Sequence, residues 1–381
     1  MYRIPLFDLN FGVEEEHAVL ETLRSKWIST GPKTAAFETE FAAMMGSRYA
    51  LALSNCTVSL HLAMNILGIA PCDEVICPSL TFIATVNAIR YVDAVPVFAD
   101  IRGPADLTID PVDVRRKITA RTKAIVVMHY AGFPCGMDDI MQIAREYGLK
   151  VVEDACHGPL SEYRAKKLGT IGDIGCFSFF SNKNMSTGEG GMLVTDDERL
   201  YEQAKLLRSH GMTTLSYERS KGHSISYDVK ALGYNYRMDD IRAAIGIVQL
   251  GKLENDLKLR AVVRGWYEEA FQAVPGVAIP FRGHVGFVSN YIFVIVLDEI
   301  YVHRRDEIRG LLLKSGIQTS MHYPPVHRFP FFSDYAVRLP QTEDVAGRLI
   351  TLPMYSSISR QEVEYIAQTI NELLQGPESK V

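Results

Sequence analysis

Short apolar runs alternate with helix-like segments through the first half of this 381-residue chain, and this alternation limits the possible folds more than any other feature. Most of the runs are apolar throughout, which is typical of parallel strands covered on both faces. The alternation predicts a doubly wound α/β domain, whose ligands sit at the carboxyl ends of the strands. The expected strands are 49–53, 74–78, 95–100, 123–128, 150–154, 176–180 and 191–195, and the expected helices are 57–68, 81–92, 111–118, 138–148 and 197–209.

The pattern changes in the second half of the chain. Residues 212–236, rich in Ser, Tyr, Gly and His, read as a long loop, and loops of this length inside a compact domain are usually functional. A long helical periodicity follows over 237–273. We therefore expect a large α/β domain over 1–250, with the N-terminal segment and the loop, and a small α+β domain over 251–381. The small domain's expected elements are strands 290–297 and 316–321 and helices 304–314 and 360–374.

The composition excludes several classes of protein. A chain with 47% apolar residues, 22% charged residues and a net charge of -5 resembles an ordinary soluble protein and gives no support for a nucleic-acid or membrane partner. The N-terminus lacks a basic segment before a long apolar run, so we expect a cytoplasmic protein. No CxxC pair occurs, which favours reduced, mostly buried thiols. His322 and His327 flank a Tyr-Pro-Pro turn in a poor arrangement for metal ligands, so no metal site is expected.

Two glycine-containing motifs resemble nucleotide-binding loops, but each lacks a residue that such a loop requires. The run from Gly246 to Leu253 matches G-x-x-x-x-G-K, yet Leu253 replaces the Ser or Thr that would hold magnesium, and the match lies in a helical pattern. In TGEGGML, Leu193 stands where the third glycine of a dinucleotide-binding fingerprint belongs. Neither run predicts a nucleotide site.

Four residues that follow different predicted strands have complementary chemistry. Thr57 lies at the start of a helix, where unpaired N–H groups can bind phosphate, although simple helix capping is the favoured explanation for this segment taken alone. Phe82 could lie flat on a planar ring or belong to the core. Asp154, which we expect to face inward while Glu153 faces away, is either a charge partner or a helix cap. Lys183 precedes STGEGG, whose glycines allow close backbone approach.

One cofactor uses all four of these groups. Pyridoxal phosphate needs an amine for a Schiff base, a carboxylate for its ring nitrogen, a stacking face and a phosphate site. Each group alone has a structural explanation, since most lysines are surface charges. A structural explanation would have to apply to each of the four residues independently, whereas one cofactor accounts for all four. The sequence therefore predicts a pyridoxal phosphate enzyme.

The chain resembles the DegT/DnrJ/EryC1/StrS family of sugar aminotransferases along nearly its whole length. The shared motifs are WISTGP (27–32), SNCTVSLHLA, SLTFIATVNA, VVEDACHG, FSFFSNKNMSTGEGG, LGYNYRMDDIRAAIG (232–246) and HYPPVH (322–327). The resemblance implies the fold type I architecture, with a large domain of mostly parallel sheet and a smaller C-terminal domain. Lys183 in place of the histidine found in the family's dehydratases argues against dehydratase chemistry.

The resemblance also implies roles for individual residues. Lys183 would bind the cofactor covalently, Asp154 would contact the pyridinium nitrogen and Phe82 would stack on the ring. The remaining cofactor residues would be His157 beside the ring hydroxyl, Cys56 (through its backbone), Thr57 and Ser178 at the phosphate, and Asn235 at the phosphate of a neighbouring subunit. Asn235 thus implies a homodimer with shared active sites. The candidates for lining the sugar pocket are WISTGP, Arg237, His322 and Tyr323.

The expected reaction is a two-step transamination from L-glutamate to a nucleotide-linked ketosugar. Lys183, desolvated and with a depressed pKa, would move a proton. Cys56 stands where many members have Gly, and S-N-K-N with STGEGG is more similar to the perosamine-synthase-like branch, which aminates C4 of a 4-keto-6-deoxyhexose. The alternatives are a C3-ketosugar or cyclitol ketone as substrate and, from another class, a non-catalytic regulatory protein on the same fold.

Overall fold

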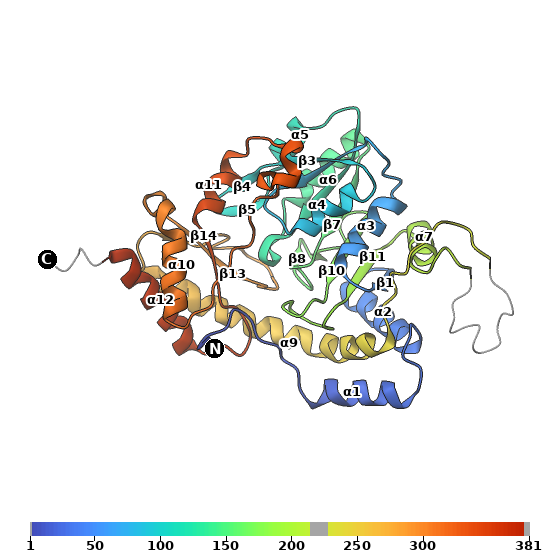
Figure 1. The fold of residues 1–381 in the computed structure, drawn as a ribbon, viewed down its shortest axis with the longest axis horizontal. Coiled ribbons are helices and arrows are strands. Elements are labelled where there is room, and N and C mark those ends of the chain that lie inside the picture. The colour runs from blue at the N-terminus through green and yellow to red at the C-terminus, as the bar shows by residue number, and fades with distance from the viewer. Residues whose placement is uncertain (1, 214–227, 377–381) are drawn as a thin grey trace.

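A seven-stranded sheet forms the centre of the computed structural model, which describes residues 2–213 and 228–376 (Figure 1). The strand order is β1-β11-β10-β7-β6-β2-β3. Only β11 runs in the opposite direction to the other six strands, so the predicted, mostly parallel sheet is confirmed. Every strand corresponds to one of the seven apolar runs, with the bounds β1 Tyr49–Leu53, β2 Glu74–Pro78, β3 Val95–Ala99, β6 Thr122–Met128, β7 Lys150–Asp154, β10 Ile174–Ser178 and β11 Gly191–Thr195.

Helices cover both faces of this sheet. Alternate side chains of one strand enter different cores: Leu51 and Leu53 pack with α3, α4 and α7, whereas Ala50 and Ala52 pack with α2 and α9. The helices α5 and α6 cover the remaining part of the second face. Burial on both faces explains why these strands are apolar throughout. The bounds are α2 Pro32–Met45, α3 Cys56–Ile66, α4 Ile83–Arg90, α5 Pro111–Arg116, α6 Met137–Tyr147, α7 Glu198–Arg208 and α9 Asp240–Ala270.

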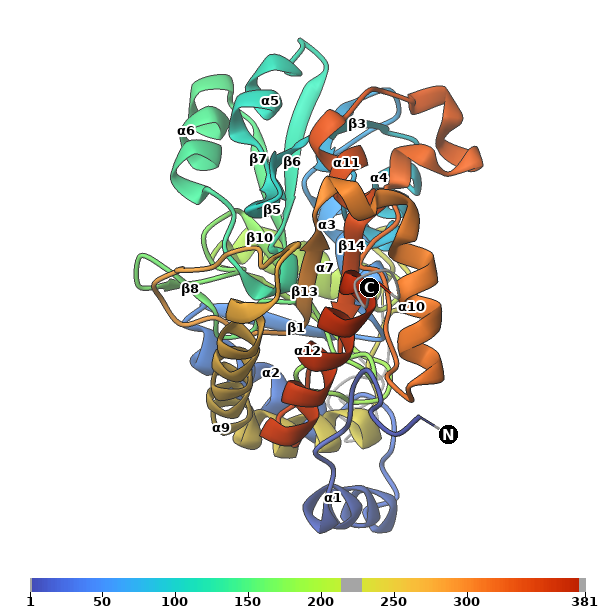
Figure 2. The same cartoon turned by 90° about the vertical axis from the view of Figure 1, so that its left-hand side faces the viewer.

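A second, antiparallel sheet and its helices form the C-terminal part of the molecule (Figure 2). It contains β12 Val277–Ala278, β13 Phe293–Leu297 and β14 Leu349–Leu352, with α10 Arg305–Lys314, α11 Pro340–Arg348 and α12 Arg360–Gln375. The predicted strand over 316–321 is wrong. Its two ends pair with different segments, Ile317 with Ile4 and Ser320 with Thr351, so only isolated bridges form. The helix α11 and the strand β14 were not among the predicted elements.

The long helix α9 joins the two parts (Figure 1). Its N-terminal half packs in the core with α2, whereas Val263 and Tyr267 pack with β13 and α12. Residue 250, the predicted end of the large domain, lies inside this helix. Ile4 is buried among the C-terminal elements rather than against the large sheet. The domain boundary at residue 250 therefore stays a prediction. Ile4 packs with the C-terminal elements, although the predicted large domain includes it.

The remaining elements are short or peripheral. The G-x-x-x-x-G-K run lies inside α9, which agrees with its rejection as a phosphate loop. Residues 214–227 of the predicted 212–236 loop lie outside the described residues. None of the helices in the described part of the chain is long and apolar enough to cross a membrane. The other bounds are α1 Val13–Arg24, β4 Ile101–Gly103, β5 Asp106–Ile109, β8 Glu162–Tyr163 and β9 Lys166–Lys167, with 3-10 turns at Tyr130–Gly132, Phe271–Ala273, Glu299–Arg304, Val326–Arg328 and Pro330–Tyr335.

Candidate active site

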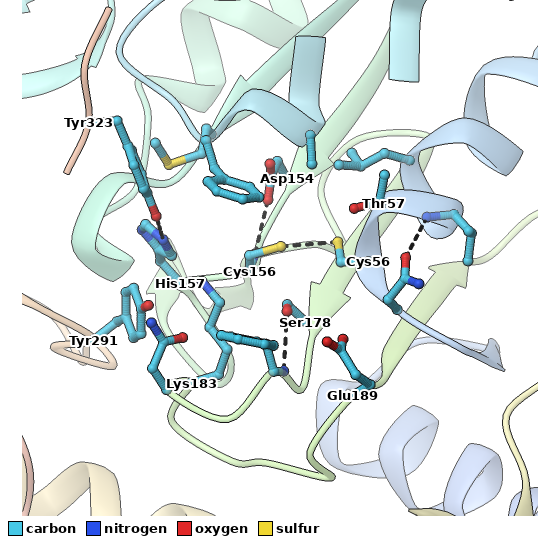
Figure 3. A pocket seen from close by; sticks show the side chains of 18 of the residues that line it. Cys56, Thr57, Asp154, Cys156, His157, Ser178, Lys183, Glu189, Tyr291 and Tyr323 are labelled. Carbon is cyan, nitrogen blue, oxygen red and sulfur yellow. Dashed lines mark hydrogen bonds between the residues drawn. The ribbon is translucent and has the colours of Figure 1, made fainter. Parts of the chain in front are cut away.

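A cavity of about 700 Å³ opens at the carboxyl ends of β1, β2, β7 and β10 (Figure 3). This is the edge at which a doubly wound sheet binds its ligands. Seven of the eight residues predicted to bind a cofactor line it, and only Asn235 lies elsewhere: the seven are Cys56, Thr57, Phe82, Asp154, His157, Ser178 and Lys183. His322 and Tyr323, two of the candidates for the sugar pocket, line the same cavity.

The helix α3 begins at the cavity wall. Asn55 caps it, because its side-chain oxygen accepts a hydrogen bond from the Val58 N–H at 3.0 Å. Gly191 of β11 allows this turn to lie against the sheet, since a Cβ at that position would come within 2.5 Å of the Asn55 carbonyl. The first N–H groups of a helix have no partner within it and attract anions. Cys56 and Thr57, which line the cavity here, fit a phosphate site.

Asp154 ends β7 and turns its carboxylate into the cavity. Its Oδ2 accepts a hydrogen bond from the Thr85 hydroxyl at 2.6 Å, and its Oδ1 accepts one from the Cys156 N–H at 3.2 Å. The side chain is 4% exposed, so these two donors hold a nearly buried carboxylate in a fixed orientation. A carboxylate held in this way fits a partner with a positively charged ring nitrogen.

Glu153 lies on the opposite side of β7, as the alternation of side chains predicts. Its carboxylate accepts hydrogen bonds from His129 Nε2 at 2.9 Å and from the N–H groups of Gly169, Ile171 and Gly172. Burial raises the pKa of Glu153, but its bonds with His129 and the loop amides outweigh burial and hold that pKa below its usual value. Glu153 thus anchors the loop after β9, and Asp154 alone faces the cavity.

Lys183 occupies the turn after β10, and its Nζ lies 4.2 Å from the centre of the Tyr291 ring. Desolvation lowers the pKa of Lys183, but interactions with Tyr291 and Cys156 outweigh it and raise that pKa above the ordinary value. The expectation of a depressed pKa is therefore wrong for this cavity. Lys183 carries its positive charge at neutral pH, over an aromatic face that favours it.

His157 is held in one neutral tautomer. Its Nδ1 accepts a hydrogen bond from the Ala131 N–H at 3.2 Å, so the proton lies on Nε2, which contacts the Tyr323 hydroxyl at 2.9 Å. Burial and then the charge of Lys183 lower the pKa of His157 well below its usual value. The ring also packs 4.2 Å from the ring centre of Tyr291. His157 is therefore an uncharged hydrogen-bond donor in the cavity wall.

The aromatic wall of the cavity comes from distant segments of the chain. Phe82, at the start of α4, is 55% exposed and lies 5.8 Å from Tyr323 between ring centres, so it presents free ring surface to a ligand. Sequence reasoning missed Tyr291, whose only signal was its place at the start of an apolar run. It also missed Tyr91, Asn182, Glu189 and Tyr236, which line the cavity too.

Asn235 lies in a second cavity of about 230 Å³. Trp27, Ser29, Thr30 and Arg237 share this cavity, so the expected sugar-pocket candidates divide between it and the Lys183 cavity, which His322 and Tyr323 line. Within one chain, the structure does not bring Asn235 to the other predicted phosphate residues. A contact from Asn235 to a neighbouring subunit stays a prediction.

Residues 10–371 match the model of the DegT/DnrJ/EryC1/StrS aminotransferase family. The chain belongs to this family. It is 40% identical over 382 residues to the spore coat polysaccharide biosynthesis protein SpsC of Bacillus subtilis (98% of this chain, 97% of that protein). It is 37% identical over 374 residues to the GDP-perosamine synthase of Escherichia coli O157:H7 (98% and 99%). The chain is thus a sugar aminotransferase.

Similar solved structures agree with this assignment. The Helicobacter pylori aminotransferase PseC, involved in the biosynthesis of pseudoaminic acid, superposes with a TM-score of 0.91 at 28% identity (96% of this chain, 98% of that one). The putative sugar aminotransferase Spr1654 of Streptococcus pneumoniae is known in a pyridoxamine phosphate form, with a TM-score of 0.91 at 28% identity (97% and 98%), and in a pyridoxal phosphate form. DesI, solved in the presence of its TDP-sugar product, has a TM-score of 0.86 at 29% identity (99% and 93%).

The family's cofactor, pyridoxal phosphate, fits the residues present. The cavity offers an amine (Lys183), an anchored carboxylate (Asp154), an exposed aromatic face (Phe82) and the start of α3. These are the four groups that the cofactor requires. The fold type I architecture, the aminotransferase activity and the use of pyridoxal phosphate, all expected from the sequence, are confirmed.

Proposed function

We propose that this sugar aminotransferase transfers an amino group from L-glutamate to C4 of a nucleotide-linked 4-keto-6-deoxyhexose. The observation that carries the proposal is the placement of Lys183 and Asp154 on one cavity, in a chain that resembles GDP-perosamine synthase over its whole length. The TDP-sugar product in the DesI structure supports a nucleotide-linked substrate. The similarity of this chain to SpsC supports a role of the enzyme in polysaccharide biosynthesis.

The chain's own residues would divide the work of this reaction. Bound pyridoxal phosphate supplies an aldehyde that exchanges amines and a ring that delocalises the electrons of a carbanion. Asp154 would hold the positive charge of the ring nitrogen, and the first turn of α3, with Thr57 and Ser178, would hold the phosphate. Phe82 would cover one face of the ring. His157, uncharged and carrying its proton on Nε2, would donate a hydrogen bond near the ring hydroxyl.

Lys183 would move the proton that both half-reactions require. Its amine lies inside the cavity. In its neutral form the amine would accept the proton from the donor's α-carbon, and as the ammonium ion, which its raised pKa favours, it would give that proton up again. Tyr291, over which the Nζ lies, would keep the amine in the cavity between proton transfers. The same group can therefore serve the donor and the acceptor in turn.

The proposed active unit is a homodimer with shared active sites. Apolar side chains are exposed on α1 and just after it, at Leu20, Leu23 and Ile28. Clustered exposed apolar groups are typical of an interface. Asn235 lies in the second cavity with Trp27 of the following segment, and in a dimer it would reach the phosphate of the partner's cofactor.

Replacing the lysine tests the central assignment. We expect Lys183→Ala to lose turnover by at least ~10³-fold, because the variant lacks the amine that would bind the cofactor and move the proton in both half-reactions. Borohydride reduction of the wild-type holoenzyme, followed by peptide mapping, should place the covalent adduct on Lys183. Lys166→Ala, which removes an exposed lysine of β9, is the matched control and should keep full activity. An adduct on another residue would refute the assignment.

Paired ketones test the position of amination. Purified enzyme is incubated with L-glutamate or L-glutamine and with a nucleotide-linked 4-keto-6-deoxyhexose, a 3-keto isomer or a cyclitol ketone, and NMR locates the new amino group. We expect amination at C4 with glutamate. Faster amination of the 3-keto sugar or of the cyclitol would favour the alternative substrates. Bound cofactor without any half-reaction would favour a regulatory protein.

A further inference from the structure

Two thiols and a carboxylate meet on one wall of the cavity (Figure 3). The Sγ atoms of Cys56, the first residue of α3, and Cys156, just after β7, lie 3.0 Å apart. An Asp154 oxygen completes a set of three ligand atoms that all lie within 4.8 Å of one another. Both cysteines are free, and the proposed reaction uses neither thiol.

We propose that Cys56, Cys156 and Asp154 form a binding site for a soft divalent cation of the zinc class in the cofactor-free enzyme. Two thiolates and one carboxylate are suitable ligands for such a cation, and the cavity leaves room for water or another group in the fourth position.

The geometry needs only a small adjustment. Zinc–sulfur bonds of about 2.3 Å in a tetrahedral site place the two sulfurs about 3.8 Å apart, so the thiols must separate by less than ~1 Å. Rotation of the Cys156 side chain, which lines the cavity, would provide this movement. Asp154 Oδ1 accepts one hydrogen bond, from the Cys156 N–H, and so keeps a lone pair for the cation.

The charges also balance. Binding replaces two thiol protons by one dication, so the net charge of the cavity does not change. Two thiolates and the Asp154 carboxylate then face the dication and the Lys183 ammonium group, which gives a sum of zero. A buried site without excess charge avoids the large cost of an unpaired ion.

The site and the cofactor should exclude each other. This step rests on the proposed function, because it takes Asp154 as the partner of the cofactor's ring nitrogen. A cation on Asp154 would occupy that carboxylate and place its charge against a cationic ring. We therefore infer that such cations inhibit by blocking cofactor loading.

Cadmium titration of the full chain tests the site directly. The enzyme is stripped of cofactor, reduced with a phosphine and titrated with Cd²⁺, and the ultraviolet thiolate-to-cadmium absorption is recorded. We expect saturation at one cadmium per chain, and loss of most of this absorption in Cys56→Ser and in Cys156→Ser. Cys72→Ser, which changes an exposed cysteine elsewhere, is the control and should bind as wild type. Equal loss in Cys72→Ser, or no saturable absorption in the wild type, would overturn the proposal.

A second measurement needs no variant and so does not depend on how the serine proteins fold. Wild-type enzyme is alkylated with and without Zn²⁺, and mass spectrometry quantifies each cysteine. We expect zinc to protect Cys56 and Cys156 and to leave labelling of Cys72 unchanged; equal labelling with and without zinc would contradict the site.

Adding pyridoxal phosphate to the cadmium-loaded enzyme should release the metal, whereas simultaneous binding of both would overturn the shared use of Asp154. A failure of the proposed amination would leave the cadmium signal intact.

Discussion

Two histidines of the cavity stay uncharged, and this leaves Lys183 as the cation that faces Asp154 there. His322 is 7% exposed, and its Nδ1 lies 3.0 Å from the Thr351 hydroxyl. Burial, followed by the charge of Lys183, lowers the pKa of His322 to about 3. His157 is neutral for the same two reasons. Neutral imidazoles can donate hydrogen bonds without competing with Lys183 for an anionic partner.

The lowered pKa of His322 predicts a pH dependence of stability. The unfolded chain binds a proton at His322 below its ordinary pKa of 6.5, whereas the folded chain binds it only near 3. Between these values the free energy of unfolding should fall as the pH falls, by about 1.4 kcal/mol per pH unit from this residue. Urea unfolding from pH 7 to pH 4 measures the slope, which should become shallower in His322→Gln. An unchanged slope would show that His322 does not contribute.

At the scale of elements, packing decides the identity of two glycines in one helix. A Cβ on Gly246 of α9 would lie 2.8 Å from the ring of Phe37, whose side chain is fully buried. A Cβ on Gly251, about one and a half turns later, would meet no atom of the described residues within 4 Å. Gly246 is therefore required by the contact between α2 and α9, whereas no neighbour among the described residues requires Gly251.

The two glycines predict opposite effects of the same substitution. Gly246→Ala should lower the free energy of unfolding by roughly 1–3 kcal/mol, because overpacking displaces the Phe37 ring. Gly251→Ala should raise it by roughly 0.5–1 kcal/mol, since alanine loses less entropy than glycine in a helix. Denaturant unfolding of both variants measures the difference. Equal effects would mean that the contact with Phe37 is not rigid.

At the scale of the whole molecule, the cavity forms where the two parts of the chain meet. Asp154 ends β7 and Lys183 lies in the turn after β10, whereas Tyr291, His322 and Tyr323 come from the C-terminal part. The exposed apolar residues of α1 lie outside both cores, on a helix that packs on α9. They are therefore available for contact with a second copy of the chain.

Disrupting this apolar surface should separate the proposed dimer. Leu20→Glu combined with Leu23→Glu should shift the protein toward monomer, because two charges would be buried at the interface. Analytical ultracentrifugation measures the mass. Cofactor affinity should fall in parallel, since Asn235 would no longer reach the partner. Leu313→Glu, on an exposed leucine of α10, is the matched control. A variant that stays dimeric would exclude α1 from the interface.

Local patterns were enough to predict most of the large domain. The seven apolar runs became the seven strands because burial on both faces leaves its mark on each strand separately. Asp154 and Lys183 were identifiable because strand ends have a fixed place in such a sheet. Where pairing depended on distant partners, as at Ile317 and Ser320, the prediction of a strand failed.

The sequence by itself determined the fold class, the family and the principal chemical groups, because each of these depends on residues close together along the chain. Only the tertiary structure decided that Tyr291 lies over Lys183, that Cys56 meets Cys156, and that Asn235 occupies a different cavity. Such contacts join segments far apart in sequence, and no local pattern records them. Their geometry is set by how the two cores pack against each other.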